Sequence, residues 1–247
     1  MRTWSVLSLA LALVGCGPSV VGRTPQGAEV VKIPLSISNA YLIKTDTPVL
    51  VDSGTAVDRD ALRAALADQN LSPRRIALVV LTHAHADHAG LAAELQAWGA
   101  RVVLGVGDLE AAERGSNDPL RATGTAGAIL EPIIPDDFEA VHPDLLVWED
   151  RPLDLRPWGV PGAAIAMPGH TPGSVVVMLD DRTAFVGDEL RGGSLSPSSP
   201  TLHYFHADRA RNRRSLETLL SWGVETFYLG HGGPVTRDDV ARALPEL

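Results

Sequence analysis

The chain has 247 residues, of which 45% are hydrophobic and 21% charged, and its formal net charge is −9. This length supports one large α/β domain or two small ones, with a sizeable core in either case. The acidic balance disfavours DNA or RNA as a partner, because a surface that binds nucleic acid needs an excess of basic residues.

The first fifteen residues predict a secretory signal peptide. Met1 and Arg2 give a short positive start, and residues 3–15 form an apolar run that is too short to span a bilayer as a helix. The run ends in Leu-Val-Gly-Cys at residues 13–16, which resembles the bacterial lipobox, where cleavage precedes a lipidated cysteine. An ordinary secretory signal with a chance cysteine, or a short membrane anchor, is the alternative. Cys16 is the only cysteine of the chain, which favours lipidation.

The lipobox resemblance implies a lipoprotein of the bacterial cell envelope, held on a membrane through Cys16. In a Gram-negative source, Gly17 rather than Asp after the cysteine implies the outer membrane, facing the periplasm. The mature chain would have no free thiol, so neither a cysteine nucleophile nor a cysteine metal ligand is expected. Residues 16–28 are rich in Gly, Pro, Ser and Thr and predict a flexible tether, which leaves residues 29–247 as the folded domain.

Hydrophobic periodicity predicts the elements in chain order. Strands are expected at residues 30–35, 40–44 and 49–51, a helix at 58–69, a buried strand at 76–81, a helix at 91–98, a strand at 101–104 and a short helix at 107–114. Residues 115–142 have no clear period and predict an exposed excursion. Further strands are expected at 144–149, 163–167, 174–179, 183–186 and 225–229, with a loop at 191–201 and an amphipathic helix at 207–222. This order predicts an α/β fold with two sheets and helices outside them.

A dense group of metal-competent side chains follows the buried strand at 76–81. Residues 83–88 read His-Ala-His-Ala-Asp-His, which places three imidazoles and a carboxylate within six positions. These are ligands that zinc and similar divalent cations prefer, and loops that follow strands commonly carry binding sites. A polar loop without a metal is the alternative, and it would need no further ligands elsewhere in the chain.

Three later segments repeat one arrangement, in which a strand is followed by a metal-competent residue flanked by glycine. They are residues 168–173 with His170, 185–188 with Asp188 and 228–233 with His231. Glycine beside each candidate allows a tight turn and a close approach of the backbone to a small ion. The candidate ligands are then His83, His85, Asp87, His88, His170, Asp188 and His231. Seven ligands exceed one four-coordinate metal and suit two metals that share a bridging carboxylate.

These motifs, in this order, resemble the metallo-β-lactamase-fold superfamily, in its glyoxalase-II-like and lactonase-like branch, over residues 29–237. The resemblance includes residues 39–43, residues 51–54 and the Thr-His-x-His-x-Asp-His motif that begins at Thr82. It implies an αββα sandwich of two mixed β-sheets with helices on the outer faces. It also implies a first metal site of His83, His85 and His170, a second of Asp87, His88 and His231, and Asp188 as the bridge.

The resemblance further implies two divalent cations, with zinc expected and iron or manganese as alternatives. Such a pair lowers the pKa of a shared water molecule to about 7, so that hydroxide attacks a carbonyl carbon. Asp87 and Asp188 would be the catalytic carboxylates, and Asp87 would also orient the hydroxide. The expected activity is hydrolysis of an ester, thioester or lactone of a small molecule.

The branch of the superfamily stays open. A β-lactamase is disfavoured, because the Cys-using subclasses need a thiolate in the second site and the remaining subclass lacks the bridging aspartate that Asp188 supplies. No glutathione-binding signature of the glyoxalase II type is found near the C-terminus, and Arg191 stands where lactonases commonly have a tyrosine. The main alternative is a persulfide dioxygenase with one iron on His83, His170 and Asp188. A third is a metal-binding lipoprotein without catalysis.

Four further side chains are candidates for substrate contact, namely Arg191, His203, Tyr204 and His206. Arg191 could meet an anionic substrate, although a solvated arginine explains it equally well. The other three could instead form a half-buried aromatic corner. Asp52 ends a strand beside the expected site, where we expect it to orient ligands through hydrogen bonds. Substrate identity and oligomeric state have no readable pattern in the sequence.

Overall fold

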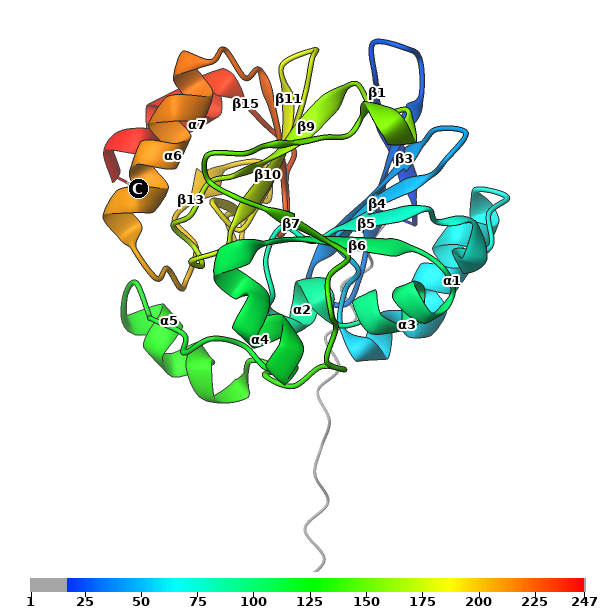
Figure 1. Ribbon diagram of the computed structural model, residues 1–247. Coiled ribbons are helices and arrows are strands. Elements are labelled where there is room, and N and C mark those ends of the chain that lie inside the picture. Colours follow the sequence, from blue (N-terminus) through cyan, green and yellow to red (C-terminus); the bar gives the residue numbers. More distant parts are fainter. Residues whose placement is uncertain (1–16, 247) are drawn as a thin grey trace, which may run out of the picture.

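The structure is a computed structural model that describes residues 17–246. Two β-sheets face each other and helices lie outside both, which confirms the expected αββα sandwich (Figure 1). The expected signal peptide and the lipidation site Cys16 lie outside the described residues. Within residues 17–246, no helix has the length and apolar character needed to cross a bilayer.

The first sheet has seven strands, which lie side by side in chain order. They are β1 (Ser19–Arg23), β2 (Glu29–Pro34), β3 (Asn39–Lys44), β4 (Val49–Val51), β5 (Leu78–Val80), β6 (Arg101–Gly105) and β7 (Leu145–Val147). Neighbours from β1 to β4 are antiparallel, and neighbours from β4 to β7 are parallel. The strands β4 and β5 are buried on both faces, which explains why their sequences are continuous apolar runs.

The second sheet has six strands in the spatial order β15-β14-β11-β10-β9-β8. They are β8 (Leu153–Asp154), β9 (Gly162–Ala166), β10 (Val175–Leu179), β11 (Thr183–Gly187), β14 (Thr226–Leu229) and β15 (Val235–Thr236). The pair β11 and β14 is parallel, and the other pairs are antiparallel. The segment predicted as a loop at 191–201 forms a small hairpin of β12 (Arg191–Gly192) and β13 (Pro200–Thr201).

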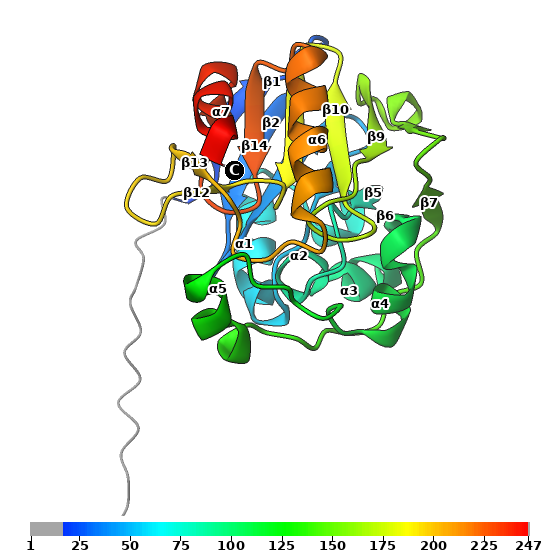
Figure 2. The ribbon, with the colours of Figure 1, turned by 90° about the vertical axis from the view of Figure 1, so that its left-hand side faces the viewer.

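Helices cover the outer face of each sheet (Figure 2). The α-helices are α1 (Arg59–Asp68), α2 (Ala86–Ala89), α3 (Ala92–Ala97), α4 (Leu109–Arg114), α5 (Thr125–Leu130), α6 (Arg209–Ser221) and α7 (Arg237–Ala243). The 3-10 turns are η1 (Ala56–Asp58), η2 (Pro73–Arg75), η3 (Val106–Asp108), η4 (Glu131–Ile133), η5 (Arg156–Trp158) and η6 (Leu244–Glu246). Three hydrophobic clusters join the layers: one under α1 and α3, one between the sheets, and one under α6 and α7.

The predicted tether at residues 16–28 is wrong for residues 19–23, which form the edge strand β1. Tyr228 donates a hydrogen bond from its hydroxyl to the Val21 carbonyl at 3.0 Å. Gly22 makes this approach possible, because a Cβ there would lie 2.6 Å from the same hydroxyl. Val20 and Val21 are apolar and favour a strand. The glycine and proline residues around them make this strand hard to recognise in the sequence. The folded domain therefore begins before residue 29.

The excursion predicted at residues 115–142 is tied to the rest of the domain. Asn117 is buried, accepts a hydrogen bond from the backbone N–H of Ala86 at 2.8 Å, and donates to the Pro135 carbonyl at 3.0 Å. Farther along, the backbone N–H of Thr123 donates to the Tyr204 carbonyl at 2.8 Å. The excursion thus lies against the segment of candidate ligands and against residues 203–206.

Candidate metal centre

The seven predicted ligands gather at one end of the sandwich. The segment 83–88 follows β5 of the first sheet, and α2 begins within it at Ala86. His170 lies between β9 and β10, Asp188 follows β11, and His231 follows β14, all in the second sheet. All seven are buried except His231, which is partly exposed. The centre is therefore built by both sheets, at the end where they meet.

The ligand atoms form two triads around one carboxylate. His83, His85 and His170 bring one ligand atom each to within 4.8 Å of one another, and so do Asp87, His88 and His231. The Oδ2 atom of Asp188 lies 3.9 Å from Nε2 of His83, 3.7 Å from Nε2 of His170, 3.5 Å from Nε2 of His88 and 3.2 Å from Nε2 of His231. Two further groups that could hold a metal ion overlap these triads through Asp188, namely His83 with His88 and Asp188, and His170 with Asp188 and His203. The two triads are the sites that the family resemblance implies, and their division into two sites stays a prediction.

Unpaired buried atoms show that these residues fit cations. Nε2 of His83, Nε2 of His88 and Oδ1 of Asp188 are buried and have no hydrogen-bond partner among residues 17–246. A buried polar atom without a partner costs about 1–3 kcal/mol. Three such atoms in one cluster call for a binding partner that is not part of the protein. The clusters are therefore able to hold metal ions.

Hydrogen bonds hold the outward-facing Nδ1 atoms of four of the five ligand histidines, whereas Nδ1 of His85 lies 3.1 Å from Nε2 of His170 within the centre. Nδ1 contacts Oδ2 of Asp52 at 2.9 Å for His88, the Phe205 carbonyl at 2.8 Å for His170, and the Ile37 carbonyl at 2.6 Å for His231. Nδ1 of His83 lies 3.0 Å from the Thr82 hydroxyl. Each of these acceptors calls for a proton on Nδ1, so Nε2 is the nitrogen that is directed into the centre and that can offer a lone pair to a cation once it has lost its own proton.

Asp52 lies behind the ligands, as the sequence predicts. Its carboxylate accepts hydrogen bonds from the Thr82 backbone N–H at 2.7 Å, from the Thr82 hydroxyl at 2.9 Å and from His88. Its backbone has φ of 60°, a left-handed conformation that costs energy for a residue with a Cβ. The hydrogen bonds hold this conformation, and Asp52 orients one ligand of the second triad.

Asp108 is a structural support that sequence reasoning missed. It accepts hydrogen bonds from the Ala84 N–H at 3.0 Å, the Thr171 hydroxyl at 2.7 Å and the Gly173 N–H at 2.6 Å. It therefore joins the two loops that carry the first triad. Burial raises the pKa of the Asp108 carboxyl to about 6. The only signal in the sequence is Gly173, where a Cβ would lie 2.3 Å from the Asp108 backbone nitrogen.

The charges of the centre are strongly coupled in the metal-free protein. Burial by itself would raise the pKa of Asp188, but the charges of His231, His203 and His88 hold it well below its usual range. Burial would likewise lower the pKa of His231, yet Asp188 and Asp87 raise it to about 10. The pKa of His88 is also raised well above its usual value, against burial, by Asp188, Asp87 and Asp52. In the metal-free protein, protons on His88 and His231 thus supply the positive charge that bound cations would otherwise provide.

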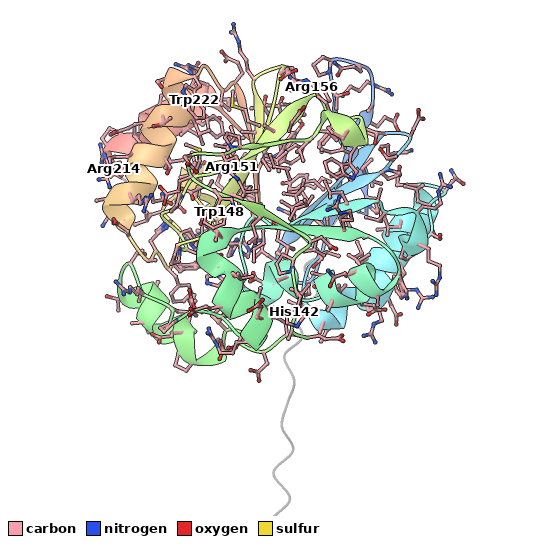
Figure 3. The ribbon with its side chains drawn as sticks, in the orientation of Figure 1. His142, Trp148, Arg151, Arg156, Arg214 and Trp222 are labelled. Atoms are coloured by element: carbon pink, nitrogen blue, oxygen red, sulfur yellow. The ribbon has the colours of Figure 1, made fainter. Side chains whose placement is uncertain are left out.

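The four predicted substrate residues have three different placements. His203 reaches the centre, with Nε2 at 3.2 Å from Oδ2 of Asp188. His206 is buried beside it and lines an open pocket of about 230 Å³ that also borders His85 and His170. Arg191 and Tyr204 pack on each other, with the guanidinium carbon 3.9 Å from the ring centroid. By contrast, the His142 side chain lies on the surface and is 78% exposed (Figure 3).

Comparison with known proteins gives consistent results. A family model described as the metallo-beta-lactamase superfamily matches residues 33–231. The chain is 26% identical over 251 residues to the "Probable metallo-hydrolase YflN" of Bacillus subtilis (strain 168), covering 91% of this chain and 93% of that protein.

Solved structures are similar over most of the chain. One is a HARLDQ motif mutant of a metallo-beta-lactamase from Cronobacter sakazakii, with a TM-score of 0.63, 25% identity and coverage of 88% of this chain and 81% of that one. Another is BJP-1, a subclass B3 metallo-beta-lactamase of Bradyrhizobium japonicum, with a TM-score of 0.64, 20% identity and coverage of 89% and 88%. At this identity the second likeness concerns the fold alone.

Proposed function

Because the chain belongs to the metallo-beta-lactamase superfamily, we propose that it is a hydrolase that uses two divalent cations, with zinc as the expected metal, to cleave an ester, thioester or lactone of a small molecule. The observation that carries this proposal is the convergence of two triads on the buried carboxylate of Asp188. Such an arrangement suits two cations that share one ligand.

Two cations in this position would supply a hydroxide at neutral pH and polarise a carbonyl group. The contribution of the chain is to hold the ligands in place and to limit access of water. Asp52 and Asp108 fix the ligand loops from behind. Asp87 keeps 12% of its side chain exposed, whereas Asp188 keeps 2%, so Asp87 is the carboxylate better placed to orient the attacking oxygen.

We expect little or no turnover of β-lactams. Cys16 is the only cysteine of the chain, so the second triad has no thiolate. The likeness to the subclass B3 enzyme is at 20% identity and does not carry an activity. A β-lactam therefore belongs in a substrate screen as one class among several.

The test is metal analysis of the purified mature protein, followed by a screen of esters, thioesters, lactones and β-lactams on the same sample. We expect two zinc ions per chain and turnover of at least one of the first three classes. Asp188→Ala should lower the metal content and abolish turnover while circular dichroism shows an intact fold. His142→Ala is the matched control, because its side chain is 78% exposed.

Two results would contradict the proposal in different ways. One iron per chain, with oxygen uptake and sulfite formation from a persulfide, would indicate the dioxygenase. Bound metal without turnover in any class would indicate a metal-binding protein that has no catalytic role.

We also propose that Cys16 is lipidated and that the protein resides in the bacterial cell envelope, on the periplasmic side of the outer membrane if the source is Gram-negative. The support is the sequence at residues 13–16 and the single cysteine. Mass spectrometry of the mature N-terminus tests this proposal. Cys16→Ser should yield a protein without acyl chains, and an unmodified Cys16 in the native protein would refute lipidation.

A further inference from the structure

An open pocket of about 230 Å³ lies directly beside the first triad. It is lined by His85, by residues 170–172, by residues 118–121 of the excursion and by residues 205–207. Sites that hold drug-sized ligands measure about 300–1,000 Å³, so a pocket of this size suits a smaller chemical group. A substrate bound at the centre can therefore extend a small part of itself into this pocket.

Backbone hydrogen bonds fix the walls of the pocket relative to the candidate ligands. The N–H of His206 donates to the Arg121 carbonyl at 3.0 Å, which joins residues 205–207 to the excursion. The N–H of Ala207 donates to the His170 carbonyl at 2.9 Å, which joins the same residues to the first triad. The pocket is therefore held in one place beside the centre, and a site formed in advance in this way binds its ligand at a lower entropic cost.

The pocket has one cationic side chain that no carboxylate neutralises. Apart from the histidines, the charged residues of its lining are Asp118 and Arg121. Asp118 pairs with Arg114 at 3.1 Å. Within residues 17–246, Arg121 forms no ion pair, and its guanidinium makes a long hydrogen bond of 3.4 Å from Nη1 to the Ala207 carbonyl, in the pocket wall. Because a guanidinium can donate two parallel hydrogen bonds to a carboxylate, the pocket suits an anionic group of this kind.

A second polar side chain of the lining, His206, has no partner. It is 4% exposed, and neither of its ring nitrogens makes a hydrogen bond to any residue that the structure describes. It also belongs to none of the four groups of residues within 17–246 that could hold a metal ion. An imidazole has a donor nitrogen in either tautomer, so the need for a partner does not depend on where the proton lies. A buried polar group of this kind indicates a partner from outside the chain.

We propose that this pocket is a subsite for a carboxylate group of the substrate, which the guanidinium of Arg121 binds. The inference rests on the proposed hydrolase function and narrows its substrates to esters, thioesters or lactones that carry an acidic group close to the carbonyl that is cleaved. Pro119, Leu120 and Phe205 supply apolar lining for the hydrocarbon that connects the two groups. Arg121 is then a residue that determines specificity and takes no part in the chemical step.

The first test measures turnover of a matched pair of substrates by the zinc-loaded full chain. Mono(para-nitrophenyl) glutarate and para-nitrophenyl pentanoate have the same leaving group and the same number of acyl carbons, but only the first ends in a carboxylate. The N-acetylcysteamine thioesters of the same two acids extend the comparison to thioesters. We expect kcat/KM to be about 10- to 100-fold higher for the substrate with the carboxylate, as is typical of a hydrogen bond between charged groups.

Substitutions of the two charged residues should change this preference in opposite directions. Arg121→Gln should abolish it, chiefly through a higher KM for the substrate with the carboxylate. Asp118→Asn removes a negative charge from the lining and should lower the same KM by up to about 5-fold. Arg74→Gln is the matched control and should keep the preference, because Arg74 is exposed in η2, at the opposite end of β5 from residues 83–88. A preference that survives in Arg121→Gln, or that Arg74→Gln also abolishes, would overturn the proposal.

Calorimetric binding to the zinc-loaded protein tests the subsite without turnover. Glutarate and pentanoate each have a carboxylate that can bind zinc, and glutarate has a second one for Arg121; succinate with butanoate, and adipate with hexanoate, vary the spacing. We expect at least one diacid to bind about 10-fold more tightly than its monoacid, and Arg121→Gln to remove the difference. Equal binding within every pair would overturn the subsite, even if esters are hydrolysed. A preference for a diacid without turnover of any ester, thioester or lactone would instead remove the hydrolase function and leave the subsite.

Discussion

At the scale of residues, the centre depends on one oxygen atom. Five imidazole nitrogens lie within 3.9 Å of Oδ2 of Asp188, although this carboxylate is 2% exposed. An isolated buried carboxylate would be costly, and so would isolated buried imidazolium groups. The charge of Asp188 helps to raise the pKa values of His88 and His231 against the effect of burial, whereas burial prevails at His83 and His170 and lowers their pKa values.

The first prediction concerns this coupling. Asp188→Asn keeps the size of the side chain and removes its charge, so the pKa of His231 should fall from about 10 towards the ordinary value of 6.5 in the metal-free protein. NMR titration of the ring protons measures this shift. An unchanged pKa in the variant would assign the elevation of the His231 pKa to Asp87 alone.

The second prediction concerns Asp108, which joins the loops of the first triad. Asp108→Ala leaves the N–H groups of Ala84 and Gly173 buried without an acceptor. Each unpaired group costs about 1–3 kcal/mol, so the free energy of unfolding should fall by about 2–6 kcal/mol, with weaker metal binding. Urea unfolding of the metal-free protein measures the first effect. Asp144→Ala, which removes a carboxylate outside the centre, is a control for metal binding.

The candidate ligands and one of their supports, Asp52, were predictable from the sequence, whereas the supports Asp108 and Asn117 were not. Histidine and aspartate clusters beside glycine are rare local patterns, so residues 83–88, 170, 188 and 231 stand out without a structure. Asp108 and Asn117 act through hydrogen bonds to backbone atoms of segments that lie far away in the sequence. No local sequence pattern predicts such contacts, because a polar loop residue that makes them cannot be distinguished in the sequence from one that does not.

At the scale of elements, the predicted strands of the buried half are confirmed, and the elements that were missed are short and largely exposed. The sequence predicted β4, β5 and β6, which are buried on both faces and read as apolar runs. It missed the strands β1, β8, β12, β13 and β15 and the helices α5 and α7, most of whose residues are exposed or partly exposed. Burial on two faces imposes a strong pattern on a sequence, and a half-exposed two-residue strand imposes almost none.

The third prediction concerns the attachment of the excursion at Asn117. Asn117→Ala removes the acceptor for the N–H of Ala86, the first residue of α2, and the donor to Pro135. We expect a loss of about 1–3 kcal/mol in stability and faster proteolytic cleavage between residues 118 and 135. Limited proteolysis with mass spectrometry locates the cuts.

Asp118→Ala is the matched control for this substitution. Asp118 pairs with Arg114 at 3.1 Å on a partly exposed surface, where such a pair contributes about 0–1 kcal/mol. Equal protease sensitivity of the two variants would show that Asn117 does not hold the excursion.

At the scale of the whole molecule, the centre links the two sheets, and its ionisation links stability to pH. In the metal-free protein the pKa of His231 is raised to about 10 and that of His88 well above 6.5. Below pH 6.5 the folded and unfolded chains both hold these protons, and their stabilising effect is complete. Between pH 6.5 and 10 the unfolded chain releases protons that the folded chain retains, so stability falls as pH rises.

The fourth prediction follows from this decrease of stability with rising pH. The Tm of the metal-free protein should decrease from pH 6.5 to pH 9, whereas with excess zinc it should not, because zinc binds the deprotonated imidazoles and its affinity rises with pH. Thermal unfolding with and without a chelator measures both. His231→Gln should flatten the metal-free profile. A metal-free Tm that rises over this range would refute the assigned protonation.

The edge strand β1 limits the distance between the folded domain and Cys16. Only Gly17 and Pro18 separate Cys16 from the first residue of β1. An extended chain spans about 3.3–3.6 Å per residue, so this connection reaches about 10 Å. Inserting ten Gly-Ser residues after Pro18 should leave turnover of dissolved substrates unchanged and slow that of substrates embedded in vesicles, if Cys16 carries lipid as proposed. The lipid anchor and its short connection would then hold the folded domain at the bilayer surface, where amphiphilic molecules are concentrated.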